Sequence, residues 1–151
     1  MKNAAKNPRA LNSQLKYKMT IFKKFDHIGV VVKDLQKAMD VLSHYFDLEP
    51  QETMEIKDLG IRIGFYPLGT GQMELIEFQK PIAGVDPIVT RPGAGVQHVA
   101  FQVDDFQQTL KTLTGKGLKV VKGFPRSGAH GQVAFFYPIV GLDLLIEICE
   151  S

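Results

Sequence analysis

The fold is decided by the stretch GVQHVAFQVDD, residues 95–105. Its alternating pattern predicts a β-strand, and the acidic pair at its end predicts the start of a helix with Asp105 as a helix-starting residue. An earlier stretch, FDHIGVVVKD at residues 25–34, has the same design. His27 corresponds to His98 and Asp34 to Asp105, in both cases 71 residues apart. The repetition predicts a duplicated chain whose two halves pack against each other.

Both halves predict the same order of elements, which is a strand, a helix and three further strands. In the first half we expect strands over residues 25–32, 52–57, 61–68 and 72–78, and an amphipathic helix from Leu35 to near Asp47. In the second half we expect strands over 97–103, 118–122, 132–137 and 143–149, and a helix from Phe106 to near Gly115. The predicted fold class is therefore α+β, with two tandem βαβββ modules whose curved sheets form a shared cleft.

The chain divides into a tail and one domain. Residues 1–24 carry seven basic side chains and no acidic one, and they lack the apolar segment of a secretory signal. We expect a solvated basic N-terminal tail; a mitochondrial presequence or a docked arm are the alternatives. The domain spans residues 25–151, with module one over 25–80, a linker rich in proline and glycine over 81–94, and module two over 95–151.

The composition excludes several classes of protein. A net charge of +2 on 151 residues is too small to indicate a nucleic-acid partner. No apolar run approaches the roughly 20 residues that a membrane-spanning helix needs. Cys149 is the single cysteine, so the chain forms no internal disulfide, and a reducing, cytoplasmic location is expected.

Four side chains form the candidate site. Glu74 and Glu147 occupy matching places in the last strands of the two halves, 73 residues apart. The alternation of strand residues places both glutamates, and both His27 and His98, on the sheet face opposite the helix. A carboxylate inside a cleft is costly unless it is paired or bound to a metal. The four residues therefore predict one divalent metal ion, such as Co, Ni, Mn, Zn or Fe, with positions left open for a substrate.

The alternative is that the two glutamates are solvated on an open sheet face and the histidines are incidental. Any one of the four residues alone favours that interpretation, whereas four in register favour the metal site. Gly29 and Ala100 are small residues placed two positions after each histidine on the same face. They would leave room for an ion and a substrate.

The sequence resembles the vicinal oxygen chelate superfamily, also called the glyoxalase/bleomycin resistance/dioxygenase superfamily, and within it the methylmalonyl-CoA epimerase group. The matching segments are DHIGVVV (26–32), GQMELIE (71–77), GVQHVAFQVDD (95–105), PRSGAHGQVAF (125–135) and LLIEI (144–148). One departure concerns the strand over 60–65, where some epimerases are thought to have a second carboxylate base. This chain has Ile61, Arg62 and Ile63 there and no acid.

The resemblance implies a metal-dependent isomerase with metal ligands at His27, Glu74, His98 and Glu147. The implied reaction inverts the centre next to the thioester of a 2-substituted acyl-CoA, such as methylmalonyl-CoA, through a metal-stabilised enolate, with Glu147 and Glu74 as the catalytic carboxylates. The loop over 128–131, which includes His130, would close over the site. The resemblance also implies a homodimer and a small-molecule partner. The net charge and the lack of a long apolar run predict neither a nucleic-acid nor a membrane partner.

Other functions use related sites. A glyoxalase I-like lactoylglutathione lyase would use the same four ligands on a glutathione adduct. A ring-cleaving dioxygenase needs only two histidines and one carboxylate, so a fourth ligand counts against it. A non-catalytic drug-binding protein lacks the ligand set, and regulation or scaffolding without a metal remains a further alternative.

Overall fold

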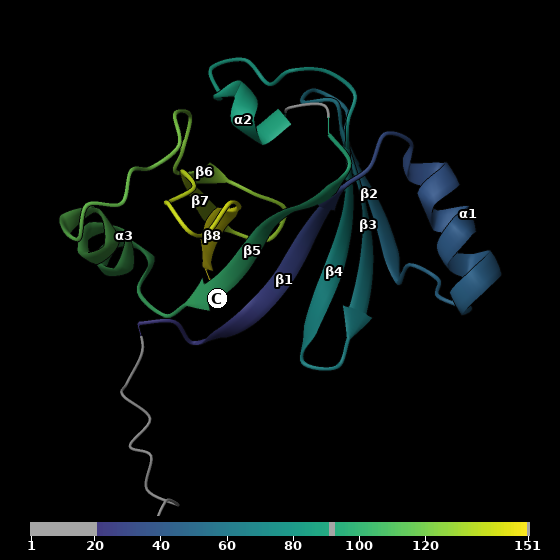
Figure 1. The fold of residues 1–151 in the computed structure, drawn as a ribbon, viewed down its shortest axis with the longest axis horizontal. Coiled ribbons are helices and arrows are strands. Elements are labelled where there is room, and N and C mark those ends of the chain that lie inside the picture. Colours follow the sequence, from purple (N-terminus) through teal and green to yellow (C-terminus); the bar gives the residue numbers. More distant parts are fainter. Residues whose placement is uncertain (1–20, 91–92, 151) are drawn as a thin grey trace, which may run out of the picture.

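The computed structural model describes residues 21–90 and 93–150 (Figure 1). All but the last four residues of the predicted basic tail lie outside the described residues. Module one contains β1 (Lys24–Val31), α1 (Leu35–Phe46), β2 (Glu52–Ile56), β3 (Ile61–Leu68) and β4 (Gly71–Phe78). Module two contains β5 (Gly95–Val103), α3 (Phe106–Gly115), β6 (Arg126–Ser127), β7 (Gln132–Phe136) and β8 (Leu145–Glu150). The short helix α2 (Pro87–Thr90) lies between the modules.

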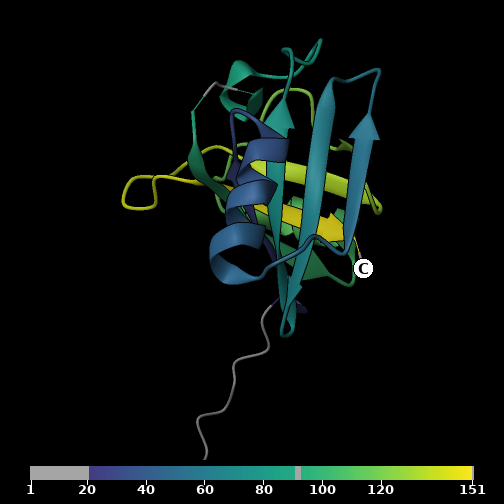
Figure 2. The ribbon, with the colours of Figure 1, turned by 90° about the vertical axis from the view of Figure 1, so that its right-hand side faces the viewer.

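The strands of the described residues form one mixed sheet of eight strands in the order β2-β3-β4-β1-β5-β8-β7-β6. Within each module the first and last strands are parallel, β1 with β4 and β5 with β8. The modules join where β1 and β5 pair antiparallel at the centre of the sheet. The sheet curls, so that the upright strands of module one stand in front of the crossing strands of module two in Figure 2. The predicted fold class of two βαβββ modules is confirmed.

Helices α1 and α3 cover the outer face of the sheet at its two sides (Figure 1). On α1, Leu35 packs with Tyr66 and Leu75 in a buried cluster. On α3, Phe106 and Leu113 pack with β-strand residues of module two. Asp34 and Asp105 start these helices, because their carboxylates accept the backbone N–H of Lys37 and Gln108 at 3.0 and 2.9 Å. These contacts use the apolar strand positions predicted to face the helices, and they leave the opposite face free for a site.

The prediction of a strand over residues 118–122 is wrong. Only Val120 makes an isolated bridge, to Phe136, and the strand next to β7 is β6 instead. The apolar pattern of this segment reflects tertiary packing, since Val121 is fully buried and Val120 packs against the core of module two. The chain then turns at Gly123, whose φ of 98° favours glycine, and so leaves the sheet.

Residues 81–90 of the predicted linker contribute to the core. Ile82, Val85 and Val89 are buried against Phe135 and Leu145 on the inner face of module two. The carboxylate of Asp86 accepts hydrogen bonds from the Ile88 backbone at 2.9 Å and from the Tyr137 hydroxyl at 2.8 Å. The connection therefore closes one end of the curled sheet. None of the helices in the described part of the chain is long and apolar enough to cross a membrane.

Candidate metal centre

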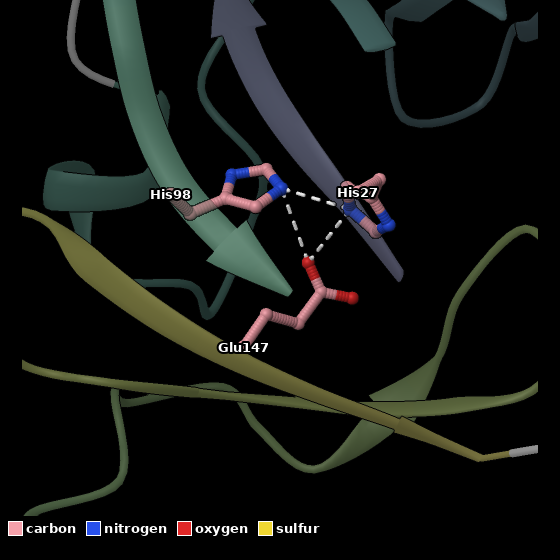
Figure 3. A group of neighbouring side chains, drawn as sticks. All are labelled: His27, His98 and Glu147. Atoms are coloured by element: carbon pink, nitrogen blue, oxygen red, sulfur yellow. Dashed lines mark hydrogen bonds and ion pairs between the residues drawn. The ribbon is translucent and has the colours of Figure 1, made fainter. Parts of the chain in front are cut away.

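Three side chains from three strands meet on the inner face of the sheet (Figure 3). His27 comes from β1, His98 from β5 and Glu147 from β8, and they are 6%, 2% and 4% exposed. The two Nε2 atoms lie 3.0 Å apart. Oε2 of Glu147 lies 3.4 Å from Nε2 of His27 and 3.2 Å from Nε2 of His98. We call these three residues the donor triangle.

The strand register explains why these residues meet. His98 is the partner of Gly29 across β1 and β5, and Ala100 is the partner of both His27 and Glu147. The small partners leave the space that the two rings and the carboxylate share. A Cβ added at Gly29 would lie 1.9 Å from Cε1 of His98, which is too close for any side chain. The absence of a side chain at Gly29 is therefore a requirement of this arrangement.

Two β-bulges hold the far nitrogens of the histidine rings. The pairing of β1 with β5 skips Asp26 on one strand and Gln97 on the other, so each bulge falls immediately before a histidine. Nδ1 of His27 lies 2.9 Å from the Asp26 carboxylate, and Nδ1 of His98 lies 2.9 Å from Oε1 of Gln97. Both oxygens are acceptors, so each Nδ1 carries a proton and donates it. In the neutral ring this leaves a lone pair on Nε2, an arrangement typical of metal-binding histidines.

The donor triangle fits a divalent metal ion. Metal–nitrogen and metal–oxygen bonds of about 2.0–2.2 Å place neighbouring ligand atoms roughly 3.0–3.5 Å apart in octahedral or tetrahedral geometry. The three observed separations lie within that interval. Two lone pairs and a carboxylate that point at one another repel unless a proton or a cation lies between them. The chemistry of this donor set therefore matches a resident metal ion.

Glu74 lies beside the donor triangle and is not part of it. Its Oε1 is 3.6 Å from Nδ1 of His27, the nitrogen that faces away from His98. The same oxygen accepts a hydrogen bond of 2.9 Å from the side chain of Gln72. Glu74 is 8% exposed and lines the same cavity as the triangle. Three of the four predicted ligands thus meet, whereas a fourth bond from Glu74 stays a prediction.

The pKa values of the cluster indicate which residue carries a proton when no metal is bound. Burial opposes charge on His27, but hydrogen bonds to Asp26 and Glu147 outweigh it and raise the pKa of His27 to about 10. Burial and the charge on His27 lower the pKa of His98 to about 3. Burial also raises the pKa of Glu147. A proton on Nε2 of His27 therefore lies where a divalent ion would bind, so metal binding should release it.

Burial raises the pKa of Glu74 to about 7, above its ordinary value of 4.5, although the nearby His27 opposes the shift. The folded state then binds more protons than the unfolded state between these values, so ionisation of Glu74 lowers the free energy of unfolding as the pH rises through this interval.

Glu74→Gln removes this ionisation. We expect the difference in unfolding free energy between the variant and the wild type to increase by up to about 3 kcal/mol from pH 5 to pH 8, in favour of the variant. One pKa unit corresponds to about 1.4 kcal/mol. Urea unfolding of both metal-free proteins at the two pH values measures the difference. Glu55→Gln, on an exposed position of β2, is the surface control. A difference between Glu74→Gln and the wild type that is independent of pH would contradict the assignment.

The cluster lies in a cavity of about 440 Å³. Residues 128–131 of the β6–β7 connection line this cavity, and the ring of His130 lies 5.5 Å from the ring of Phe65 on β3 of the other module. The loop therefore reaches across the cleft, and its closure over a bound substrate stays a prediction. Cys149 also lines the cavity, and burial raises the pKa of its thiol, which disfavours a nucleophilic thiolate.

The family described as the glyoxalase/bleomycin resistance protein/dioxygenase superfamily matches residues 26–136 of this chain. The mitochondrial methylmalonyl-CoA epimerase of Dictyostelium discoideum is 27% identical over 133 residues, which cover 85% of this chain and 78% of the relative. The corresponding protein of Bos taurus is 28% identical over 132 residues, which cover 85% and 74%.

A solved structure shows the same fold. It is a variant of Streptomyces coelicolor methylmalonyl-CoA epimerase in complex with 2-nitronate-propionyl-CoA, 24% identical to this chain. The two superpose with a TM-score of 0.71 over 86% of this chain and 95% of the other. The family match covers most of the domain, including three of the four predicted site residues, His27, Glu74 and His98. The chain therefore belongs to the glyoxalase/bleomycin resistance protein/dioxygenase superfamily.

Proposed function

We propose that this protein epimerises a 2-substituted acyl-CoA, such as methylmalonyl-CoA, with one divalent metal ion. The observation that carries the proposal is the donor triangle with a further buried carboxylate, Glu74, in one cavity. The curated relatives that act as methylmalonyl-CoA epimerases support the choice of reaction. The complex of the structural relative with a propionyl-CoA analogue supports an acyl-CoA as the small-molecule partner.

His27, His98 and Glu147 would hold the metal. A bound divalent ion would stabilise negative charge on the oxygen atoms of the substrate next to the reacting carbon. The bulge residues Asp26 and Gln97 keep the two rings oriented throughout. The three residues of the donor triangle are 6% exposed or less.

Two carboxylates can move the proton. Glu74 projects from β4 of module one and Glu147 from β8 of module two, so they reach the cavity from different sides of the central strand pair. When Glu74 takes the proton from the carbon, the electron pair of the C–H bond moves into the enolate. Glu147 would hold the metal through Oε2, so a proton carried on its other oxygen would return to the opposite face of the carbon. Burial raises the pKa of Glu74, which suits this carboxyl group to both steps. β3 offers no further base, since Ile61 and Ile63 are its residues in the cavity wall.

Exchange of the substrate proton tests this reaction directly. In D₂O, the protein with added Co²⁺ or Ni²⁺ should place deuterium on the carbon next to the thioester of methylmalonyl-CoA, measured by mass spectrometry. A chelator should abolish the exchange, and Glu74→Gln should slow it by about 10²-fold or more. Turnover of a glutathione hemithioacetal without any exchange on methylmalonyl-CoA would favour the lyase instead.

One observation favours a second candidate. Two histidines and one carboxylate are also the ligands of non-haem iron oxygenases. Ring cleavage of a catechol with O₂ consumption by the Fe²⁺-loaded protein would support a dioxygenase. The second buried carboxylate, Glu74, argues for proton transfer over that reaction.

The metal's identity, a homodimer and a cytoplasmic location stay predictions.

A further inference from the structure

The cavity has two chemically different ends, which follows from the strand register. On β4, Glu74 is the partner of Gly29 and Phe65. Two residues further along the same strand, Ile76 is the partner of Val31 and Ile63. After two more residues of β4, Phe78 is the partner of Ile61. Moving from Glu74 towards Phe78 therefore leads away from the donor triangle along a wall of aliphatic and aromatic side chains.

The opposite direction leads to polar side chains. In module two, Glu147 is the partner of Phe135, and two residues further along β8 Cys149 is the partner of Val133 and Gln102. Val133 in turn pairs with Arg126. Arg126, Ser127, His130, Gln102 and Glu150 all line the cavity. The donor triangle therefore lies between an apolar end, towards the carboxyl end of β4, and a polar end, towards the carboxyl end of β8.

The linker closes the apolar end. Ile82 and Val89 line the cavity and are 8% and 3% exposed. Helix α2 lies at the end of the molecule where β1 ends and β5 begins (Figure 1). Gln97 donates a hydrogen bond from its amide to the carbonyl of Val89, while its oxygen holds His98. Gln97 thus connects the linker directly to the metal centre.

We propose that the apolar end holds an uncharged hydrocarbon group, larger than methyl, on the carbon next to the thioester. The inference rests on the proposed function and names its substrate class. The apolar wall runs along β4 from Glu74 to Phe78, which is four residues or about 13 Å of strand and much longer than a methyl group. No charged side chain lies among the described residues that line the apolar end, namely Ile56, Leu59, Ile61, Ile63, Ile76, Phe78, Ile82, Val89, Phe124 and Phe135. A charged group there would lose its hydration without a partner.

Binding to the metal-free protein tests the inference independently of catalysis. The probes are malonyl-CoA thioesters with methyl, ethyl, propyl or butyl at the 2-position, titrated by calorimetry in the presence of a chelator. Affinity should rise about fourfold per added methylene, or about 60-fold from methyl to butyl. A terminal carboxylate on the butyl chain should cancel the gain. Affinity that is independent of chain length would overturn the inference.

Two variants test whether the gain in affinity with chain length arises at the apolar end. Ile63→Phe fills the apolar end, so it should keep the affinity for the methyl compound and lose the gain from longer chains. Met54→Phe is the matched control, because Met54 packs against the same cluster but does not line the cavity. If Ile63→Phe does not fold, Ile61→Phe at a half-buried position of the same wall replaces it. A chain-length gain that survives filling of this wall would also overturn the inference.

Failure of this inference and failure of the proposed function are distinguishable. Deuterium exchange on methylmalonyl-CoA without any preference for longer chains would retain the epimerase and exclude the larger substituent. A chain-length preference in binding would support the apolar subsite even if no exchange occurred.

Discussion

Glu147→Gln should lower the affinity of the protein for a divalent metal by at least about 100-fold. The substitution keeps the shape of the side chain but replaces the charged oxygen that lies 3.2 and 3.4 Å from the two Nε2 atoms. A neutral amide supplies a weaker ligand and no charge to balance the ion. His98→Ala should have a similar effect, because it removes one of the two nitrogens. Metal analysis after dialysis should find about one ion per chain in the wild type and none in either variant.

His44→Ala is the control for this measurement, because His44 is exposed on the outer helix α1. It should retain the metal content of the wild type. Titration with Co²⁺ in two buffers of different ionisation enthalpy adds a second measurement, since the proton on His27 should leave as the ion binds. Retention of the metal by both Glu147→Gln and His98→Ala would show that the ion binds elsewhere.

The sequence was sufficient to place the site residues on the correct face of the sheet. Strand side chains alternate with a period of two, so the face of a residue follows from its position in the strand. The duplicated pattern then matched His27 with His98 and Glu74 with Glu147. All four are buried on the inner face, as predicted. The helices α1 and α3 were equally predictable, because their periodic apolar residues and their Asp caps are local signals.

The distances within the site could not be predicted, because they depend on register between strands far apart in the sequence. Alternation does not reveal that His98 lies opposite Gly29, or that Glu74 lies beside the other nitrogen of His27. The roles of Asp26 and Gln97 were missed for a related reason. Strict alternation points these residues to the helix side, and only the bulges turn them towards the rings. The available signal was a polar residue directly before each histidine.

Segments shorter than a few residues also escaped prediction. Helix α2 has four residues, too few for a helical period, and its burial depends on contacts with module two. The two-residue strand β6 is defined only by its pairing with β7. Both elements line the cavity. Their positions depend on tertiary contacts, so this part of the cavity wall could not be predicted from the sequence.

Gly29→Ala should disrupt the metal centre as severely as the loss of a ligand. The new methyl group would lie 1.9 Å from the His98 ring, so the ring would have to move by about 1.5 Å to reach the 3.4 Å at which ordinary contact begins. The ring contacts Phe135 on one side, and any such movement takes its Nε2 out of the donor triangle. We expect a loss of metal affinity similar to that of His98→Ala and a loss of about 1–3 kcal/mol in unfolding free energy. Calorimetric metal titration and urea unfolding measure the two effects.

The matched control for this substitution is Gly115→Ala in the last turn of α3, where an added Cβ meets nothing within 4 Å. It should leave metal binding unchanged and stabilise the protein slightly, since alanine favours the helix. A double variant isolates the cause. If the clash with the His98 ring is responsible, Gly29→Ala should cost little stability in the His98→Ala background, where that ring is absent. An equal cost in both backgrounds would instead assign the effect of Gly29→Ala to the backbone of β1.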